Sequence, residues 1–349
     1  MPKFSVVLAT RDRPGLFSEA LNSVLMQTFS DFEVIVMNDG SSPDFDAGYE
    51  NAYKIGGEKL GSRLQIHRLI RRPKGHGKGF AVNLGVDHAT GNYVCFLDDD
   101  DTWVDSGHLA RAAAALDAFE QADLYMANQK AYLRNEEVPG PIWLEALGGE
   151  LLGRGVKPSA GGVFKLNVND LMQTRGFCHM NCLIVRRELF KTIGGIDEGI
   201  RWEEDRDLFL RLLDKADIML FHPAFVSRHN VPDPAKTQNM TTSVSMLEKR
   251  LLQIRVLDKA ALFSAHPLIQ AHALTHKGYA LKKIVEELMQ KGQWKLAAYY
   301  AREALGATPT IKWTIYTLYC IFCGVFRQSR PTAAIESKQR STPKLKNKP

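Results

Sequence analysis

Four consecutive carboxylates, Asp98 to Asp101, are the residues of this sequence whose types and spacing most clearly allow chemistry. They directly follow the apolar, β-favouring run 93–97, a pattern typical of a buried parallel strand that delivers polar side chains at its carboxyl end. Neighbouring carboxylates repel one another, so a divalent cation or several hydrogen-bond donors must neutralise them at neutral pH. Oxygen ligands favour magnesium or manganese. The alternative is an exposed acidic turn that caps the next helix, because Asp is favoured near a helix N-terminus.

A second acidic group consists of Glu203, Glu204, Asp205 and Asp207, next to Trp202. The apolar positions that follow have helical spacing, so these acids are predicted at the N-terminal end of a helix. Capping and the helix dipole explain one or two acids there, and this segment has more. We therefore interpret Asp205 or Glu204 as a general base that takes a proton from a substrate hydroxyl, with capping as the alternative.

Three further candidates lie in loops and at strand ends. Asp39 follows a predicted strand in an Asn-Asp-Gly turn, where it could accept from a base N–H or a ribose hydroxyl, although such turns are often structural. Lys78 belongs to the basic, glycine-rich loop 71–79, which could reach a diphosphate or be a solvated loop. His229 ends a strand-like run and is a candidate for metal or phosphate binding; a lone histidine is otherwise structural.

These side chains need a sheet whose strands end at one edge. Apolar runs of strand length occur at 4–10, 32–37, 64–70 and 93–97, and helical or polar segments separate them. This alternation predicts a βαβ opening and a parallel sheet. Ligands of open α/β sheets bind outside the carboxyl ends of the strands, where Asp39 and the four aspartates fall.

The second half of this domain is less regular. We predict a helix over 109–119, strands over 124–127 and 221–230, and ordered structure over 183–190. Prolines and paired glycines interrupt the segment 128–181, which we interpret as the variable face that meets a second substrate.

Several short motifs occur in a fixed order between residues 3 and 230. They are Thr10-Arg11 with Pro14, Val24-Leu-Met-Gln-Thr-Phe29, Asn38-Asp-Gly-Ser41, Asn83, Gly91-Asn-Tyr93, Phe96-Leu-Asp-Asp-Asp-Asp101 with Trp103, Gly194-Gly195 with Asp197-Glu198, and Glu204-Asp205 with Leu208 and Arg211. This ordered set resembles the family 2 glycosyltransferases. The resemblance implies a GT-A fold, an α/β fold with a Rossmann-like, mixed and mostly parallel sheet and helices on both faces. It also implies a nucleotide-sugar donor, a divalent metal and inversion at the anomeric carbon.

The resemblance further implies roles for single residues in binding the donor. Asp39 would contact the base or ribose, and Thr10 and Arg11 would line the same pocket. The residues expected to bind the donor are Thr10, Arg11, Asp39, Lys78, Asn83, Asp98 and Asp99.

The metal and the base follow from the same resemblance. Asp98 and Asp100 match the metal-binding acids, with Asp100 the stronger candidate and Asp99 close enough to share the role, and His229 matches a histidine near the metal and diphosphate. Asp205 matches the base that deprotonates the acceptor hydroxyl.

One position departs from the family pattern. Many members carry an Arg directly before the Asn that stands here as Asn83, and this chain has Val82. If that Arg steadies the diphosphate, then Lys78 or Arg72 must replace it, or the donor differs.

Composition and charge describe a globular chain with a basic end. Its 349 residues are 45% apolar and 24% charged, which allows a catalytic domain over 1–233 and a smaller region over 234–326. Residues 327–349 contain seven Lys or Arg and one acid, which accounts for the whole net charge of +6. The rest is neutral, so no nucleic-acid face is implied, and this tail is predicted to be disordered.

The region 234–326 has helical periodicity, with helices predicted over 246–261, 268–291 and 294–305. Small and apolar residues between 280 and 309 resemble one tetratricopeptide-like hairpin, which cannot bury both of its faces alone.

The run 311–326 is rich in aromatic residues and short for a membrane span. Two readings remain open: an interfacial helix that binds an anionic membrane together with the basic tail, or a helix packed on the hairpin. Cys320 and Cys323 are expected to pack in this helix rather than to bind metal.

Together these features predict a metal-dependent (Mn²⁺ or Mg²⁺) inverting glycosyltransferase. It would move one sugar, from a UDP-sugar as the expected donor, to a glycan or lipid-linked acceptor in cell-surface polysaccharide synthesis. No QxxRW pattern of processive members is present. The five cysteines and the lack of a leader pattern before Phe4 predict a cytoplasmic protein, peripheral on the cytoplasmic face of the inner membrane if 311–349 binds lipid.

Two other functions compete with this prediction. A nucleotidyltransferase would want a glycine-rich loop after the first strand, which Thr10-Arg-Asp-Arg-Pro14 does not supply. A non-catalytic scaffold would keep the fold and act through its helical tail.

Overall fold

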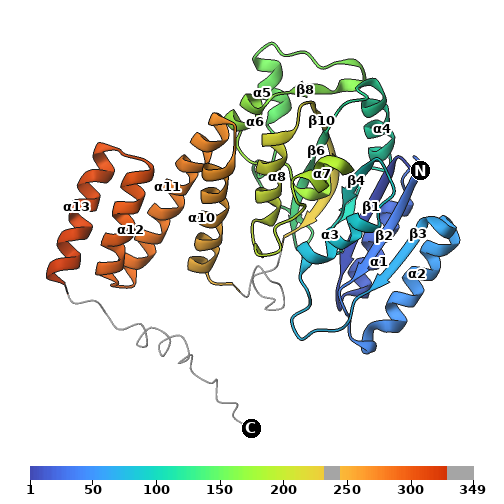
Figure 1. The fold of residues 1–349 in the computed structure, drawn as a ribbon, viewed down its shortest axis with the longest axis horizontal. Helices are drawn as coiled ribbons and strands as arrows, with labels where there is room; N and C mark the ends of the chain where they lie inside the picture. Colours follow the sequence, from blue (N-terminus) through green and yellow to red (C-terminus); the bar gives the residue numbers. More distant parts are fainter. Residues whose placement is uncertain (232–243, 328–349) are drawn as a thin grey trace, which may run out of the picture. The chain divides into compact units, whose positions relative to one another are not determined.

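The computed structural model describes residues 1–231 and 244–327 (Figure 1). The chain divides into two compact units. They are Met1–Val244 with Ser264–Ile269, and Ser245–Phe263 with Gln270–Pro349. The predicted boundary at 233/234 and the predicted disordered tail beyond residue 327 lie outside the described residues.

The first unit opens with four parallel strands, β1 (Phe4–Thr10), β2 (Phe32–Asn38), β3 (Leu64–Arg68) and β4 (Tyr93–Phe96). They lie in the order β3-β2-β1-β4, and each neighbouring pair is parallel. Nearly every residue of β1 and all of β2 are buried, so both faces of these strands are covered. The βαβ opening is confirmed, and the carboxyl ends of β1, β2 and β4 share one edge.

The sheet continues beyond β4 with mixed strand directions. Its order is β4-β9-β6-β10-β5; β9 is antiparallel to β4 and β6, whereas β6 and β10 are parallel. The longest registers belong to parallel pairs, so the predicted mixed, mostly parallel sheet is confirmed. The remaining strands are β5 (Thr102–Trp103), β6 (Leu124–Leu133), β7 (Glu136–Glu137), β8 (Phe164–Leu166), β9 (Leu183–Arg186) and β10 (Met219–Asn230).

Helices connect these strands, and short 3-10 turns adjoin them. The helices are α1 (Pro14–Leu25), α2 (Asp46–Leu60), α3 (Lys78–His88), α4 (His108–Ala118), α5 (Leu147–Gly153), α6 (Val168–Gln173), α7 (Arg187–Thr192) and α8 (Glu204–Lys215), and the turns are η1 (Pro43–Phe45), η2 (Gly61–Arg63), η3 (Ala160–Gly162) and η4 (Met180–Cys182).

The segment 128–181 is more ordered than predicted. Strand β6 runs to Leu133 rather than ending at residue 127, because its later residues pair with β10. Helix α6 forms because Asn167 and Asp170 make a capping box at its start. The capping box is a local polar signal that the proline and glycine content concealed, whereas the extension of β6 depends on its partner strand.

Helix α3 lies unusually close to the sheet at Gly85. A Cβ at this position would lie 2.6 Å from Cγ1 of Val7 on β1 and 3.0 Å from Cγ of Met37 on β2. Only a glycine permits this approach without a shift of the helix. The approach matters for the site, because α3 begins at Lys78.

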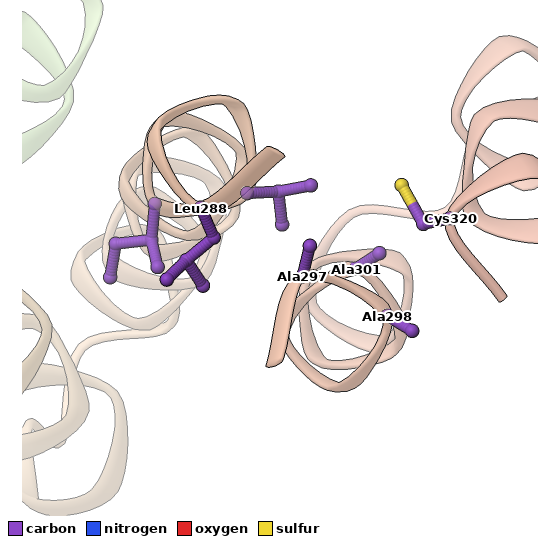
Figure 2. Packing of buried hydrophobic residues seen from close by; sticks show 7 residues of the cluster. Leu288, Ala297, Ala298, Ala301 and Cys320 are labelled. Atoms are coloured by element: carbon purple, nitrogen blue, oxygen red, sulfur yellow. The ribbon is translucent and has the colours of Figure 1, made fainter. Parts of the chain in front are cut away.

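The second unit contains α10 (Met246–Phe263), most of α11 (Pro267–Gln290), α12 (Trp294–Ala307) and α13 (Ile311–Phe326). The predicted C-terminal helical region is therefore confirmed. Its core joins α11, α12 and α13, and Figure 2 shows Ala297 and Ala301 of α12 between the helices that carry Leu288 and Cys320. The small alanines allow the helices to approach closely; the tetratricopeptide-like character stays a prediction.

Helix α13 has two different faces. Thr317, Cys320, Cys323 and Gly324 are buried, in keeping with the packing role expected for both cysteines. The opposite face is apolar and 57–84% exposed, and it consists of Ile311, Ile315, Leu318, Phe322 and Val325, which we call the outer face of α13. Within the described parts of the chain, no helix has both the length and the apolarity to cross a bilayer.

We predict that the free energy of unfolding of Gly85→Ala is about 1–3 kcal/mol lower than that of Gly57→Ala, because the methyl group added at Gly85 overpacks α3 against β1 and β2. Urea denaturation measures this difference. Gly57→Ala on α2 is the matched control, since nothing lies within 4 Å of its added Cβ. Both changes gain the helix propensity of Ala, about 1 kcal/mol, so their difference isolates the packing cost. Equal stability of the two variants would contradict the close approach.

Candidate active site

The four consecutive aspartates form a turn directly after β4, in which the backbone N–H of Asp101 donates to the carbonyl of Asp98. Asp98, Asp100 and Asp101 each offer an oxygen atom, and these atoms lie within 4.8 Å of one another. Hard oxygen ligands at this spacing suit one magnesium or manganese ion. The structure thus brings together the predicted ligands Asp98 and Asp100 and adds Asp101, which the sequence analysis had not selected.

Two basic side chains neutralise this turn. Nζ of Lys78 lies 2.7 Å from Asp98, and the guanidinium of Arg13 lies 2.7 Å from Asp99 and 2.9 Å from Asp100. Asp99 and Asp101 are buried, and the next helix, α4, has no side-chain cap. The alternative of an exposed, helix-capping acidic turn is therefore wrong.

The aspartates of the turn differ in their proton affinity. Burial alone would raise the pKa of Asp98, but Lys78 and then His179 lower it to about 2. Burial raises the pKa of Asp99 to about 7, against the attraction of Arg13 and with repulsion from Asp100. Asp98 therefore stays negatively charged, whereas Asp99 binds a proton more readily than an ordinary carboxyl group.

Asp101 is the anchor of the turn and has no solvent exposure. It accepts hydrogen bonds from the side chain of Asn181 at 2.6 Å and the backbone N–H of Asn230 at 2.7 Å. Nδ1 of His229 lies 2.7 Å from the same carboxylate. Burial would lower the pKa of His229, but Asp101, together with Asp98 and Asp100, raises it above its ordinary value. His229 thus reaches the acids through Asp101, and its role as a metal ligand stays a prediction.

The second acidic group lies at the start of α8, as predicted. Glu203 and Asp207 have arginine partners on this helix at 2.6 Å, which gives them a structural role. Glu204 and Asp205 face the aspartate turn instead. Oε1 of Glu204 lies 3.8 Å from Nζ of Lys78, so one ammonium group joins the two acidic groups.

Buried charges around Lys78 change the pKa values of the acids. Burial raises the pKa of Glu204 to about 6, with Lys78 opposing and Asp205 adding to the shift. Burial alone would lower the pKa of Lys78, but the nearby acids, with Asp98 and Glu204 first, raise this pKa above its ordinary value. Lys78 therefore remains charged, and it lies between two acids rather than in a free loop.

Two of the predicted donor-pocket residues, Asp39 and Arg11, contact the loop 71–79, and Thr10 contacts α2. Asp39 lies after β2 and is buried; its oxygens accept from the backbone N–H groups of His76 at 2.9 Å and Gly77 at 3.1 Å. Arg11 donates to the carbonyl of Arg72 at 2.7 Å, and Thr10 bonds Tyr49 at 2.8 Å. The glycine-rich loop and Asp39 thus form one hydrogen-bonded unit. Contact of Asp39, Thr10 or Arg11 with a nucleotide stays a prediction.

Asn83 has a different environment from the other candidates. Its amide donates to the carbonyl of Ile196 at 2.9 Å and to Glu198 at 3.0 Å, and it accepts from the N–H of Ile196 at 2.8 Å. These bonds fasten α3 to the Gly194-Gly195 turn. The predicted contact of Asn83 with a donor would require it to exchange these partners.

Besides Asp101, sequence reasoning missed Arg13, Trp143, His179 and Asn181. Arg13 could have been found, because it lies in the polar loop at the carboxyl end of β1. The other three come from the interrupted segment 128–181, where no periodic pattern marks them. Ring packing brings Trp143 within 5.2 Å of His229 and 6.0 Å of His179 between centroids.

Comparison with known proteins gives matches over the same part of the chain. The sequence profile of Glycosyl transferase family 2 matches residues 5–194. A PGL/p-HBAD biosynthesis glycosyltransferase of Mycobacterium bovis (strain BCG / Pasteur 1173P2) is 30% identical over 228 residues, 65% of this chain and 73% of that protein. The succinoglycan biosynthesis protein ExoW of Rhizobium meliloti is 33% identical over 197 residues, 55% of this chain and 58% of that protein.

Similarity to a solved structure extends further along the chain. The structure of S. aureus TarS 1-349 in complex with UDP-GlcNAc has a TM-score of 0.62 and 19% identity, and it covers 93% of this chain and 88% of that chain. At this identity, the likeness establishes the fold and not the ligand.

We predict that Glu204→Gln changes how stability depends on pH. The raised pKa of Glu204, about 6 against an ordinary 4.5, means that the folded state binds its proton more tightly than the unfolded state. Its contribution is present below pH 4.5 and is lost as pH rises through 6. The variant should therefore gain about 2 kcal/mol relative to the unsubstituted protein between pH 4.5 and 7.

Urea denaturation in the presence of a chelator, at several pH values, measures this change. Glu188→Gln is the control, because the Glu188 side chain is 76% exposed. A stability difference between Glu204→Gln and the unsubstituted protein that stays constant with pH would contradict the raised pKa.

Proposed function

The chain belongs to glycosyl transferase family 2, and from this premise we propose that it transfers one sugar, with inversion, from a UDP-sugar to a hydroxyl of a glycan or lipid-linked acceptor. It is a glycosyltransferase with a GT-A fold and a C-terminal helical region. One observation carries the finer proposal: the aspartate turn after β4 and the acids of α8 meet across a single ammonium group, Lys78. Sugar transfer needs stabilisation of the leaving diphosphate and deprotonation of the attacking hydroxyl side by side, and the two acidic groups would supply these two functions.

Asp205 is the proposed general base. Glu204 lies near Lys78, whereas Asp205, also at the start of α8, has no lysine partner among the described residues. The acceptor oxygen forms a bond to the anomeric carbon as the bond from that carbon to the diphosphate oxygen breaks, and Asp205 takes the hydroxyl proton. No protein nucleophile is required for a single displacement. Glu204 is the second candidate for the base.

The charge on the leaving diphosphate needs stabilisation. Asp98, Asp100 and Asp101 fit a divalent cation, and His229 adjoins them. A bound Mg²⁺ or Mn²⁺ would supply electrostatic stabilisation of the leaving group. Lys78 is the residue of this chain placed to take over the role of the arginine that Val82 replaces.

The names of two relatives support a role in glycan synthesis. One is a PGL/p-HBAD biosynthesis glycosyltransferase and the other a succinoglycan biosynthesis protein. The structure of TarS with UDP-GlcNAc supports a UDP-sugar as donor. We extend these to an acceptor in cell-surface polysaccharide synthesis. A non-catalytic scaffold would not need two acidic groups that face each other. Neither of the two relatives named here is a nucleotidyltransferase, so that alternative has no support from them.

The outer face of α13 supports a second, peripheral partner, an anionic membrane surface on the cytoplasmic side. An amphipathic helix with exposed apolar residues and a following basic segment has two signals for an anionic bilayer. Residues 327–349 carry a net charge of +6, which would repel a second copy of this chain and attract anionic lipid. A membrane position would place the protein near a lipid-linked acceptor.

Asp205→Asn should lower kcat for sugar transfer by about a hundredfold or more, because the amide cannot accept the hydroxyl proton. The measurement is release of UDP and formation of glycosylated acceptor. Asp87→Asn on α3 is the control and should retain full activity, since the side chain of Asp87 is 68% exposed. Undiminished transfer by Asp205→Asn would count against Asp205 as the base.

Donor binding is measured separately by thermal shift with UDP-sugars, with and without manganese, because a ligand that binds the folded state raises its stability. Asp205→Asn should keep this shift. Absence of both the shift and turnover in the unsubstituted protein, across a panel of nucleotide sugars, would favour the scaffold.

Phe322→Ser together with Val325→Ser should abolish most binding to vesicles that contain anionic phosphatidylglycerol, because apolar burial is lost. Cosedimentation at low and high salt measures binding, which should weaken as salt rises. Leu262→Ser is the control, an equally exposed apolar residue of α10. If the outer face instead joins copies of this chain, the double variant will change the oligomeric state without affecting vesicle binding.

A further inference from the structure

His179 lies between the two acidic groups and has no part in the function proposed above. It is 8% exposed and begins the short turn η4, just before β9. Its Nε2 lies 3.5 Å from Oδ2 of Asp205. This is the nearest polar neighbour that the structure gives to that oxygen among the described ion pairs.

The turn that carries His179 is fixed to the aspartate turn. The side-chain oxygen of Asn181 accepts from the N–H of Asp98 at 3.0 Å, and the carbonyl of Asn181 accepts from the indole N–H of Trp103 at 2.8 Å. The side-chain amide of Asn181 also donates to Asp101. His179 therefore has a set position relative to the acids.

Hydrogen bonding decides which nitrogen of His179 carries the proton. The backbone N–H of Asn181 donates to Nδ1 at 3.3 Å, so Nδ1 must keep its lone pair. In the neutral ring, the proton then lies on Nε2, the atom that faces Asp205.

Neighbouring rings hold this orientation. The centroid of Trp143 lies 6.0 Å from that of His179 at 70°, and the centroid of His229 lies 5.0 Å away at 55°. These contacts, together with the bond to Nδ1, oppose rotation of the imidazole. The other oxygen of Asp205, Oδ1, accepts from the N–H of Arg206 at 2.8 Å.

We propose that His179 is a positioning residue for the general base: its Nε2–H and the N–H of Arg206 hold the two oxygens of Asp205 so that a lone pair points to the acceptor hydroxyl. This inference rests on the proposed function. The 3.5 Å separation shortens to a hydrogen bond in the substrate complex, as catalytic contacts often do. A misplaced base costs turnover and not substrate affinity.

Two substitutions separate this role from a purely structural one. In His179→Asn, the side-chain oxygen can still accept from the N–H of Asn181, as in an Asx turn, but nothing reaches Asp205. In His179→Gln, the longer amide can donate to Asp205 from near the position of Nε2, while the bond to Asn181 is lost. The stability order and the activity order of the two variants should therefore be opposite.

We expect His179→Asn to keep near-normal thermal stability and to lose about ten- to hundredfold in kcat, with KM for donor and acceptor unchanged. His179→Gln should be less stable and keep kcat within a few-fold. In an Asp205→Asn background, His179→Asn should cause little further loss, because both changes remove the same function.

Three outcomes would overturn the proposal. They are full kcat in His179→Asn, a greater loss of kcat in His179→Gln than in His179→Asn, or additive losses in the double variant. Failure of this inference is distinct from failure of the proposed function: in the former the unsubstituted protein still transfers sugar and Asp205→Asn does not. An unsubstituted protein without turnover would overturn both.

Discussion

Mutual repulsion of buried carboxylates is the constraint on which this site depends. Six acids, Asp98 to Asp101 with Glu204 and Asp205, come from two segments about a hundred residues apart. The two segments meet at Lys78, which lies near Asp98 and Glu204. Each acid removed from water needs a partner, since an unpaired buried charge costs several kcal/mol. Lys78, Arg13 and the donors around Asp101 supply these partners. So many neighbouring negative charges are stable only while these cationic and hydrogen-bonding partners are in place. The same charges are suited to bind a further cation and a charged substrate.

The packing of the backbone elements sets the positions of the side chains that neutralise the acids. Lys78 is the first residue of α3, and the close packing of Gly85 against β1 and β2 sets the height of that helix above the sheet. Asn83, on the same helix, fixes the turn at Ile196 that precedes α8. One helix thus positions the ammonium group and holds the approach to the second acidic group. The geometry of the site is therefore linked to the packing of the core.

The second unit follows a different physical rule. In its core, α12 contributes small side chains such as Ala297 and Ala301, which allow the neighbouring helices to approach closely, whereas α11 contributes the larger Ile284, Val285 and Leu288. A further apolar surface, the outer face of α13, stays exposed. An exposed apolar surface of this kind points to a binding partner, and the basic sequence that follows α13 favours a partner with negative charge.

The sequence by itself determined the alternation of strands and helices, the acids after β4, the acidic start of α8 and the four C-terminal helices. These follow from periodicity and from local signals, which depend only on neighbours in the chain. It also indicated the family, because many short motifs occur in order. It could not decide the order β4-β9-β6-β10, the ordered elements within 128–181, or which side chains neutralise the acids.

Tertiary structure alone decided these points, for one physical reason: the partner of a charged group lies nearby in space and not in sequence. Asp101 meets Asn181 and His229, and Glu204 meets Lys78, across separations that no local pattern encodes. Asn83, selected as a donor ligand by its position in a motif, bonds a turn more than a hundred residues away in the sequence. His179 has no distinguishing signal in the sequence; only its place between Asn181 and Asp205 fixes its proton and suggests its role.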